Sequence, residues 1–564
     1  MDYKNSYFQW LEMFKDDDKT YQELLSIKDN EEEIKDRFYG DLVFGTAGMR
    51  GIIAAGRNRM NIYTVRRASQ GFADYILSTG STASIAVGYD SRHFSKEFAL
   101  ESALVFVANG ITALLFDALR PVALLSFAVR HYKCAAGIVI TASHNPAEYN
   151  GYKTYWSDGA QLPPEPAEAV TNCINSLSYS GTKTISEKAA LESGLLKYIG
   201  SELDEVYYNM VMKLSIRPQE CLAHGKDISI VYTPLNGSGN VPVMEVLRRA
   251  GFSKVYTVPE QQFPDPAFTT VGVPNPENKD AYKLALEIAD EKGADLVFAT
   301  DPDCDRVGVA ARLENGEYVM LTGNQIGVLL SHYIMSGLKE KGTLPKNGAI
   351  VKSIVSTEMV RIIGEDFGVA VVDVLTGFKF IAEKIQEFEE SGEFDFLFGF
   401  EESFGYLSGK DVRDKDGVNA SLLLAECALM HKEAGRTLYE GLTKIYDTYG
   451  WCLEDVASVN FPGADGQNNM AKAMSGLRSA PPKEIGGVKV TQVVDYLEDI
   501  PGYTKSNVLF YKLEGGSWVC VRPSGTEPKV KLYVNCMART KEAAQNALAP
   551  MSDDAKEMLS KAIG

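Results

Sequence analysis

The sequence predicts an α/β protein made of three similar mixed α/β domains followed by a smaller α+β domain. From Thr64 onward, amphipathic helical patterns alternate with short apolar runs, which is typical of strands joined by crossover helices. This alternation restarts twice, and each pass ends in a loop dense in charged and polar residues. Open α/β sheets bind ligands at such loops, so function is expected there.

Length and charge limit the classes of protein to which the chain can belong. Its 564 residues suggest three to four domains at roughly 150 residues per domain. Lys and Arg total 57 against 75 Asp and Glu, a net charge of −18. This balance argues against nucleic-acid or membrane partners, which need a broad basic face, but a small anionic substrate needs only a local cluster.

The start of the chain and its cysteines favour a cytoplasmic protein. The first residues lack the basic start and apolar core of a signal peptide, and the richest apolar stretch is interrupted by Asn109, Asp117, Arg120 and Pro121. The eight cysteines show no C-x-x-C pair, so reduced, mostly buried thiols are expected. Cys304 lies inside an acidic motif but is interpreted as a small spacer.

The elements follow in order along the chain. The first pass alternates helical patterns at 64–77 and 95–110 with apolar runs at 84–90, 111–116 and 137–141. The second extends from 228 to 313, and the third from 323 to 407. The tail has short strands around one helix near 467–476 and ends in a final helix. The expected domains are therefore 1–205, 206–320, 321–450 and 451–564.

A metal site is the first chemical hypothesis. Asp301, Asp303 and Asp305 alternate in DPDCDR directly after an apolar strand, and carboxylates so spaced can converge on Mg²⁺. An EF-hand is excluded because Arg306 and Arg312 occupy the positions of its glycine and glutamate. An acidic surface turn is the alternative.

Two further loops suggest phosphate and sugar binding. Residues 522–529, RPSGTEPK, combine an arginine, two hydroxyls, a glycine and a lysine, which suits a phosphate cradle or merely a hairpin turn. In GFEESFG, Glu401 and Glu402 could accept hydrogen bonds from sugar hydroxyls, or form a solvated acidic strand end. The glycine-rich FGTAGMRG at 44–51 is a weak signal by itself.

The segment AGIVITASHNPAEYNGYK presents Ser143 on a turn held extended by Pro146. No G-x-S-x-G elbow is present, and the side chain of the adjacent His144 is not expected to meet the serine head-on, so an acyl-transfer triad is disfavoured. Phosphoryl chemistry suits Ser143 better, because Mg²⁺ and nearby cations could hold a serine phosphate. Lys153 could then deprotonate an incoming hydroxyl if neighbouring cations lower its pKa.

Together, TASHNPAEYNGYK, DPDCDR, GFEESFG and RPSGTEPK closely resemble the α-D-phosphohexomutases, and FGTAGMRG resembles their phosphoglucomutase-2 and phosphopentomutase branch. GYDSR at 88–92, NPE at 275–277 and TGFKF at 376–380 agree as well. The resemblance covers the chain from about residue 40 to its end and implies four domains around a central cleft. Asn236, where the family often has histidine, and Cys304, where it often has glycine or alanine, depart from the pattern.

The resemblance also implies roles for individual residues. The catalytic candidates are Ser143 as phosphoserine, Lys153 as acid/base, Arg50 to steady the phosphoryl group, and His144. Asp301, Asp303 and Asp305 would hold Mg²⁺ together with the Ser143 phosphate. The substrate-binding candidates are Arg306, Lys379, Glu401, Ser403, Arg522, Ser524, Gly525, Thr526 and Lys529.

The implied activity is that of a phosphoglucomutase, an isomerase that interconverts glucose 1-phosphate and glucose 6-phosphate. Phospho-Ser143 would donate to the sugar's free hydroxyl, the sugar 1,6-bisphosphate would turn end for end, and the other phosphoryl group would return to Ser143. The substrates are small sugar phosphates, and a monomer or homodimer is expected. Mannose or pentose phosphate as main substrate, a phosphoserine hydrolase and a noncatalytic sugar-phosphate sensor are the alternatives.

Overall fold

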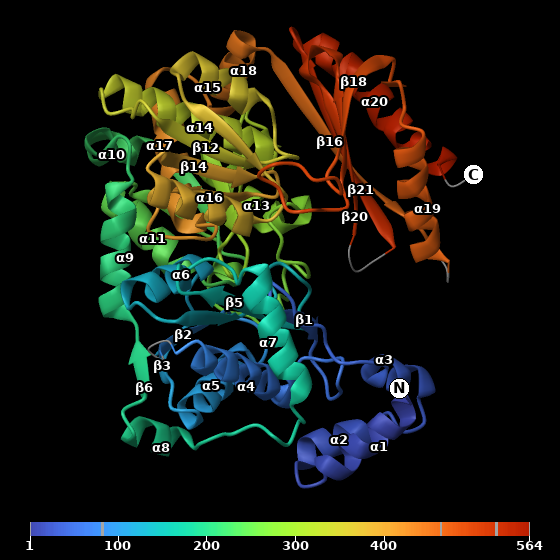
Figure 1. Ribbon diagram of the computed structural model, residues 1–564. Coiled ribbons are helices and arrows are strands. Elements are labelled where there is room, and N and C mark those ends of the chain that lie inside the picture. The colour runs from blue at the N-terminus through green and yellow to red at the C-terminus, as the bar shows by residue number, and fades with distance from the viewer. Residues whose placement is uncertain (1, 81–83, 463–464, 525–527, 563–564) are drawn as a thin grey trace. The chain divides into compact units, whose positions relative to one another are not determined.

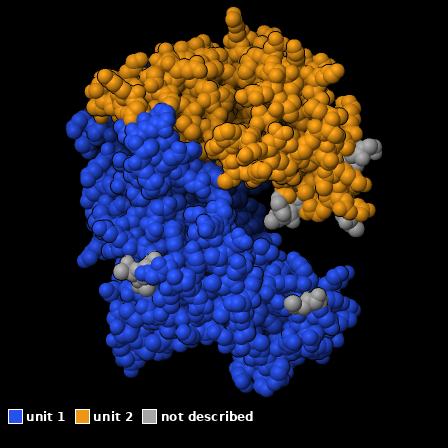
Figure 2. Space-filling view, in the orientation of Figure 1, with its two compact units in different colours: residues 1–323, 378–437 blue, residues 324–377, 438–564 orange. Residues whose placement is uncertain are grey.

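The computed structural model describes residues 2–80, 84–462, 465–524 and 528–562. The chain divides into two compact units, which Figure 2 shows in blue and orange. Unit 1 comprises Met1–Gly323 and Phe378–Thr437, and unit 2 comprises Asn324–Gly377 and Leu438–Gly564. Among the described residues, no helix combines the length and the apolar character needed to cross a membrane.

Three helices that the sequence patterns did not predict precede the first sheet: α1 (Tyr3–Met13), α2 (Asp18–Ser26) and α3 (Glu31–Phe38). Each begins at a side-chain cap, because Asp2, Asp17 and Asn30 accept hydrogen bonds from backbone N–H groups of the first turn. The three helices follow one another at the N-terminal end of the chain (Figure 1). They share a small core that includes Trp10 and Phe38.

The first sheet of unit 1 has six strands in the order β1-β5-β4-β2-β3-β6. These are β1 (Met49–Ile52), β2 (Ser84–Tyr89), β3 (Thr112–Phe116), β4 (Ala136–Ile140), β5 (Tyr149–Trp156) and β6 (Leu196–Ile199). The associated helices are α4 (Ile62–Ser78), α5 (Ser95–Ala108), α6 (Val122–His131), α7 (Pro164–Ser176) and α8 (Glu187–Glu192). Helices α4 and α5 lie on one side of the sheet and α6 on the other (Figure 1).

The second sheet of unit 1 has five strands in the order β11-β10-β9-β7-β8. These are β7 (Ser229–Thr233), β8 (Lys254–Thr257), β9 (Leu296–Thr300), β10 (Val307–Arg312) and β11 (Tyr318–Met320). Its helices are α9 (Ser201–Lys213), α10 (Pro218–His224), α11 (Asn240–Ala250), α12 (Pro259–Gln262) and α13 (Lys283–Lys292). Strand β9 is buried along its whole length, as its uninterrupted apolar run predicts.

The elements of the third pass are shared between the units. Unit 2 contains the parallel strands β12 (Gly348–Ser353) and β13 (Ala370–Val374), together with α15 (Met359–Phe367) and α18 (Leu438–Tyr449). Helix α14 (Gly323–Glu340) starts at the last residue of the first segment of unit 1. Unit 1 contains α16 (Phe378–Ser391), the antiparallel strands β14 (Asp395–Glu401) and β15 (Gly405–Ser408), and α17 (Gly417–Glu433).

The C-terminal part of unit 2 is an antiparallel sheet with helices packed on it (Figure 1). The strand order is β16-β21-β20-β19-β18-β17. The elements are β16 (Trp451–Asn460), β17 (Glu484–Ile485), β18 (Val488–Asp495), β19 (Leu509–Leu513), β20 (Trp518–Pro523), β21 (Lys529–Ala538), α19 (Gly466–Ser479) and α20 (Lys541–Lys561). The predicted α/β fold with an α+β C-terminal domain is confirmed. The domain limits near residues 205, 320 and 450 stay predictions.

Candidate active site

Three loops with functional residues occupy equivalent places in the fold. Each joins a buried strand to an antiparallel neighbour: β4 to β5, β9 to β10, and β14 to β15. Each also contains one non-glycine residue with left-handed backbone, namely Ser143 (φ 52°), Cys304 (φ 54°) and Phe404 (φ 66°). L-residues rarely adopt this conformation, so the three turns are constrained by their surroundings.

Ser143 lies buried at the turn after β4. Its hydroxyl donates a 2.7 Å hydrogen bond to Asp301 Oδ2, and its backbone N–H donates to Thr141 Oγ1 at 2.8 Å. Thr141 in turn donates to Asp303 Oδ2 at 3.2 Å. The serine hydroxyl is therefore directed at the aspartate loop, although the two are 158 residues apart in sequence.

His144 differs from the expectation for a sequence neighbour. Its Nδ1 lies 3.1 Å from Ser143 Oγ, so the two side chains do meet. The left-handed backbone at Ser143 brings them together. Burial and the positive charges of Arg306 and Arg50 lower the pKa of His144 to about 2, so the imidazole is neutral at physiological pH.

Asp301, Asp303 and Asp305 converge as the sequence predicts. All three are buried, and one carboxylate oxygen from each lies within 4.8 Å of the others. Asp303 Oδ1 and Asp305 Oδ1 are buried without a hydrogen-bond partner. Because unpaired buried carboxylate oxygens are costly, and because the donor set is entirely oxygen, these residues fit a hard divalent cation.

The charges around the triad are unevenly distributed. Burial, together with the charges of Asp303 and Asp305, raises the pKa of Asp301 well above its usual value. Burial alone would also raise the pKa of Asp305, but the ammonium groups of Lys153 and Lys415 outweigh it and hold that pKa well below the usual value. A cation would relieve the repulsion at Asp301.

Lys153, on β5, contacts two of the three aspartates. Its Nζ lies 2.6 Å from Asp303 Oδ2 and 3.0 Å from Asp305 Oδ2. Burial disfavours the ammonium form, but the two carboxylates outweigh this and raise the pKa of Lys153. The sequence analysis expected neighbouring cations to lower the pKa of Lys153. The structure differs because the charges nearest to the lysine are negative.

Lys415 is a site residue that the sequence reasoning missed. Its Nζ lies 3.0 Å from Asp305 Oδ2 and 3.0 Å from Asp414 Oδ1. Asp414 also accepts hydrogen bonds from Tyr155 and Gln161. The signal available in the sequence was the run of alternating charges at 410–416 (KDVRDKD). The structure buries all but the first two of these residues.

The two arginine candidates contact different parts of the site. Arg50, on β1, donates to Asn145 Oδ1 at 3.0 Å and so contacts the Ser143 loop. Arg306 follows the triad directly and forms an ion pair with Glu277 of the NPE segment. Its Nε is buried without a hydrogen-bond partner.

The sugar-binding candidates lie on the third loop and on α16. Glu401, at the end of β14, is buried, and Ser403 is half-buried. Phe404 accepts the backbone N–H of Val307 through its carbonyl at 3.1 Å, which joins this loop to the strand after the aspartate triad. Lys379 Nζ donates to Thr46 in the FGTAGMRG segment at 3.3 Å.

The predicted phosphate cradle belongs to unit 2. Arg522 is on β20, Lys529 begins β21, and the backbone N–H of Ser524 donates to the carbonyl of Lys529 at 2.8 Å. These residues form the base of a β-hairpin. Gly525 and Thr526 lie outside the described residues.

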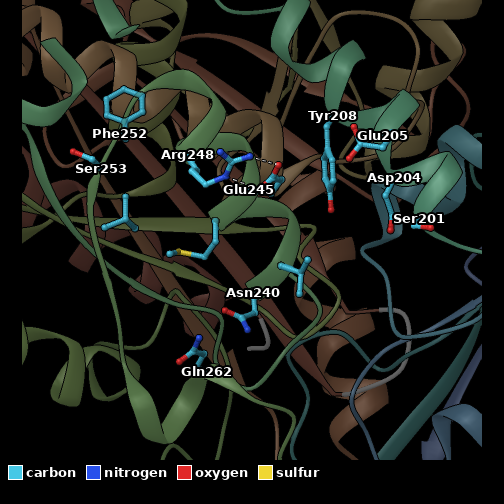
Figure 3. Close-up of a pocket in the computed structure, with 13 residues that line it drawn as sticks. Ser201, Asp204, Glu205, Tyr208, Asn240, Glu245, Arg248, Phe252, Ser253 and Gln262 are labelled. Atoms are coloured by element: carbon cyan, nitrogen blue, oxygen red, sulfur yellow. Dashed lines mark hydrogen bonds and ion pairs between the residues drawn. The ribbon is translucent and has the colours of Figure 1, made fainter. Parts of the chain in front are cut away.

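A separate pocket of about 720 Å³ lies between α9 and α11 in unit 1 (Figure 3). Its Glu245 carboxylate is paired with Arg248 and Arg249, both at 2.7 Å, and these contacts lower the pKa of Glu245 to about 2. None of the described candidate residues lines this pocket, so the chemistry is assigned to the Ser143 and aspartate loops instead.

Comparison with known proteins identifies the relatives of the chain. The model of phosphoglucomutase/phosphomannomutase alpha/beta/alpha domain I matches residues 41–180, and those of domains II, III and the C-terminal domain match 205–314, 322–449 and 477–549. A Staphylococcus aureus phosphoglucomutase is 36% identical over 518 residues, covering 90% of this chain and 92% of that protein. A Staphylococcus haemolyticus phosphoglucomutase is 35% identical and covers 88% and 91%.

Solved structures share the fold. The open form of the Paramecium phosphoprotein pp63/parafusin, a phosphoglucomutase, superposes with a TM-score of 0.72 at 18% identity, covering 92% of this chain and 95% of that one. A phosphoglucomutase/phosphomannomutase family protein from Burkholderia thailandensis gives 0.68 at 18% identity, covering 92% and 97%. From the four successive domain matches and the identity over nine-tenths of its length, the chain belongs to the phosphoglucomutase/phosphomannomutase family, the α-D-phosphohexomutases.

Proposed function

We propose that this enzyme interconverts glucose 1-phosphate and glucose 6-phosphate with Ser143 as the carrier of the phosphoryl group. As a phosphohexomutase it is an isomerase that moves phosphate within one sugar, and the named Staphylococcus relatives are phosphoglucomutases. The observation that carries the proposal is the hydrogen bond from the Ser143 hydroxyl to Asp301 of the buried triad.

Mg²⁺ is the proposed metal, held by Asp301, Asp303, Asp305 and the Ser143 phosphate. Three converging carboxylates, two of them with a buried oxygen that has no hydrogen-bond partner, support this choice. When bound, the ion would neutralise charge on the triad and on the phosphoryl oxygens.

The chain's own residues would carry the transfer in both directions. The sugar hydroxyl attacks phosphorus, the bond from phosphorus to Ser143 Oγ breaks, and the hydroxyl proton passes to a base. Lys153, on β5, is the proposed acid/base, since its Nζ contacts Asp303 and Asp305 of the triad. These carboxylates raise its pKa, and a metal ion bound to them would weaken their hold on its proton. Arg50 and Arg306 are proposed to steady the phosphoryl group, and neutral His144 to orient the Ser143 hydroxyl.

The sugar must bind in two orientations, because either of its phosphates has to reach Ser143. Glu401 is proposed to accept hydrogen bonds from the sugar hydroxyls, and Ser403 to accept or donate them. Lys379 is proposed as a further substrate-binding residue. The phosphate that does not react is assigned to Arg522, Ser524, Gly525, Thr526 and Lys529, a cradle that needs no metal. Glucose 1,6-bisphosphate is thus the proposed intermediate and activator. We further propose that the enzyme is cytoplasmic and acts as a monomer or homodimer.

The test combines substrate choice with loss of the nucleophile. Turnover is measured on glucose 1-, mannose 1- and ribose 1-phosphate, each with a catalytic trace of its bisphosphate, for the wild type and Ser143→Ala. We expect the glucose ester to be preferred, the variant to lose at least about 10³-fold in kcat, and intact mass to show phosphate on wild-type Ser143 only. Full activity of Ser143→Ala would sink the proposal, and a large preference for ribose or mannose would change the substrate.

A further inference from the structure

A buried arginine outside the predicted site residues binds the backbone of the Ser143 loop. Arg92 follows β2, and its side chain is 0% exposed. Its guanidinium donates hydrogen bonds to four carbonyl oxygens: those of the loop residues Ser143, Asn145 and Pro146 (2.8 Å), and that of Tyr149 (3.2 Å), the first residue of β5. One side chain thus binds the backbone at several points from Ser143 to the start of β5.

Asp90 forms a buried ion pair with the guanidinium, without a hydrogen bond between the two groups. Its Oδ2 lies 3.3 Å from Arg92 Nε, and both side chains are fully buried. Asp90 Oδ1 accepts the backbone N–H of Arg92 at 2.9 Å and the Ser95 hydroxyl at 2.7 Å. The backbone N–H of Asp90 donates to the carbonyl of Ile140, the last residue of β4. The position of the guanidinium is therefore tied to strand β4 through Asp90, independently of the loop that it binds.

The contacts of Arg92 fall where the loop backbone is least favourable. Ser143 has a φ of 52°, a conformation that L-residues rarely adopt. Arg92 bonds its carbonyl and Thr141 Oγ1 accepts its N–H, so the peptide groups on both sides of Ser143 are held. With its backbone held in this way, the Ser143 hydroxyl is presented to Asp301 at 2.7 Å.

Arg92 also reaches the part of unit 1 that supplies the aspartate triad. Its Cζ lies 5.0 Å from the ring centroid of Phe268, a fully buried residue between α12 and α13. This distance is within the range of a cation–π contact. The guanidinium consequently touches both the serine loop and the second α/β segment.

We infer that Arg92, held by Asp90, is a positioning residue for phosphoryl transfer, setting Ser143 Oγ against the aspartate loop without touching substrate. The inference rests on the proposed role of Ser143. A displacement of about 1 Å at a reacting group can lower a rate about 100-fold, so the expected effect is on kcat.

The test uses Arg92→Met and Arg92→Lys, with Arg67→Met as the matched control. Arg67 is another nearly buried arginine of the first α/β segment, with its bonds to Asp41, Leu177 and Tyr179 away from the Ser143 loop. We expect Arg92→Met to lower kcat about 100-fold and Arg92→Lys about 10-fold, with the KM for glucose 1-phosphate changed less than about threefold. Arg67→Met should lower Tm while leaving kcat within about threefold.

Two further readouts separate positioning from simple stabilisation. In single-turnover experiments with glucose 1,6-bisphosphate, the Arg92 variants should phosphorylate Ser143 more slowly, in proportion to their loss in kcat. Amide hydrogen exchange should rise in peptides covering 141–149 in Arg92→Lys but not in Arg67→Met. If Arg92→Met does not fold, Arg92→Lys carries the same comparison, since lysine can still donate to a loop carbonyl.

The inference is overturned if the Arg92 variants match Arg67→Met in kcat at equal fractions folded, or if only KM changes. These results leave the proposed function intact as long as Ser143→Ala remains inactive. An active Ser143→Ala would instead refute the proposed function, whatever Arg92 does.

Discussion

At the scale of single residues, the left-handed backbone at the three loops constrains what each position can hold. Cys304 is buried in the aspartate loop at φ 54°, and its carbonyl accepts the backbone N–H of Gly417 at 3.1 Å. A Cβ on Gly239 would lie 2.8 Å from its sulfur. The space around this side chain is therefore closed, and the backbone favours glycine.

Substitutions at Cys304 test this directly. Cys304→Gly relieves the strain of a Cβ at positive φ, which costs about 1–2 kcal/mol. It also loses the stabilisation from burying the cysteine side chain, which is of similar size. We expect its free energy of unfolding to stay within about 1 kcal/mol of wild type and its activity within about threefold. Cys304→Val adds β-branching at positive φ in a closed space and should destabilise the protein by about 3 kcal/mol.

Urea unfolding and steady-state kinetics measure both effects. Ser253→Val, on an exposed position beside β8, serves as the control for valine itself. Equal stability of Cys304→Val and wild type would show that the loop relaxes easily and that its backbone is not constrained.

The sequence shows which residues can do chemistry better than it shows what holds them. The aspartates of 301–305 and Ser143 could be predicted because each motif is short and follows an apolar strand. The roles of Lys415 and Arg92 could not, because the site residues that they contact, Asp305 and Ser143, lie 110 and 51 residues away in sequence and meet them only through packing. The pKa of Lys153 likewise depends on which charges the fold places beside it.

At the scale of elements, the strands and helices with strong periodicity were predicted and the short or polar ones were not. The apolar runs ending at Thr300 and Thr141 mark β9 and β4 because they are fully buried. The strand-like run after the aspartate loop was recognised, but the antiparallel direction of the strands that follow the loops was not anticipated, since helix–strand alternation suggests parallel neighbours. The helices α1 to α3 were missed as well; their mean hydropathy is low, and their common core is small.

The start of α17 shows how one cap sets the pH dependence of an element. Asp416 caps this helix by accepting the backbone N–H groups of Val418 and Asn419, both at 3.0 Å, and it accepts the Tyr207 hydroxyl at 2.8 Å. Burial nevertheless raises the pKa of Asp416 to about 6, and these hydrogen bonds do not outweigh it. The ionised cap therefore lowers stability at neutral pH.

Asp416→Asn keeps a capping oxygen and removes the charge. Because the pKa of Asp416 is raised, the folded protein binds this proton at a higher pH than the unfolded chain does. The loss of stability caused by the buried charge is therefore present above pH 6 and disappears as the pH falls towards about 4. At about 1.4 kcal/mol per unit of pKa, we expect Asp416→Asn to be about 2 kcal/mol more stable than wild type at pH 7, with the difference vanishing near pH 4.

Asp416→Ala, which has no capping atom and leaves the Tyr207 hydroxyl unpaired, should instead be less stable by about 1–3 kcal/mol. Chemical denaturation from pH 4 to pH 8 measures all three proteins. A constant difference between Asp416→Asn and wild type over this range would contradict the titration of Asp416.

At the scale of the whole molecule, the candidate residues are divided between the two compact units. The serine, the triad, Lys153 and Lys415 belong to unit 1, and the residues of the second phosphate cradle belong to unit 2. A ligand that binds only the triad is therefore expected to stabilise unit 1 in particular, since binding to the folded state alone adds to its stability.

Magnesium tests this division. At 100 times its dissociation constant, Mg²⁺ should add about 2.7 kcal/mol to the free energy of unfolding. Amide exchange should slow in peptides covering 136–156 and 294–312 but not in those of β16 to β21, because the Asp303 and Asp305 oxygens that lack hydrogen-bond partners lie in unit 1. Asp303→Asn should lose the whole effect, whereas Glu291→Gln, at an exposed carboxylate paired with Lys292, should keep it. Stabilisation by Mg²⁺ that persists in Asp303→Asn, or protection that appears first in the C-terminal sheet, would place the metal elsewhere and remove the physical basis for assigning phosphoryl transfer to Ser143.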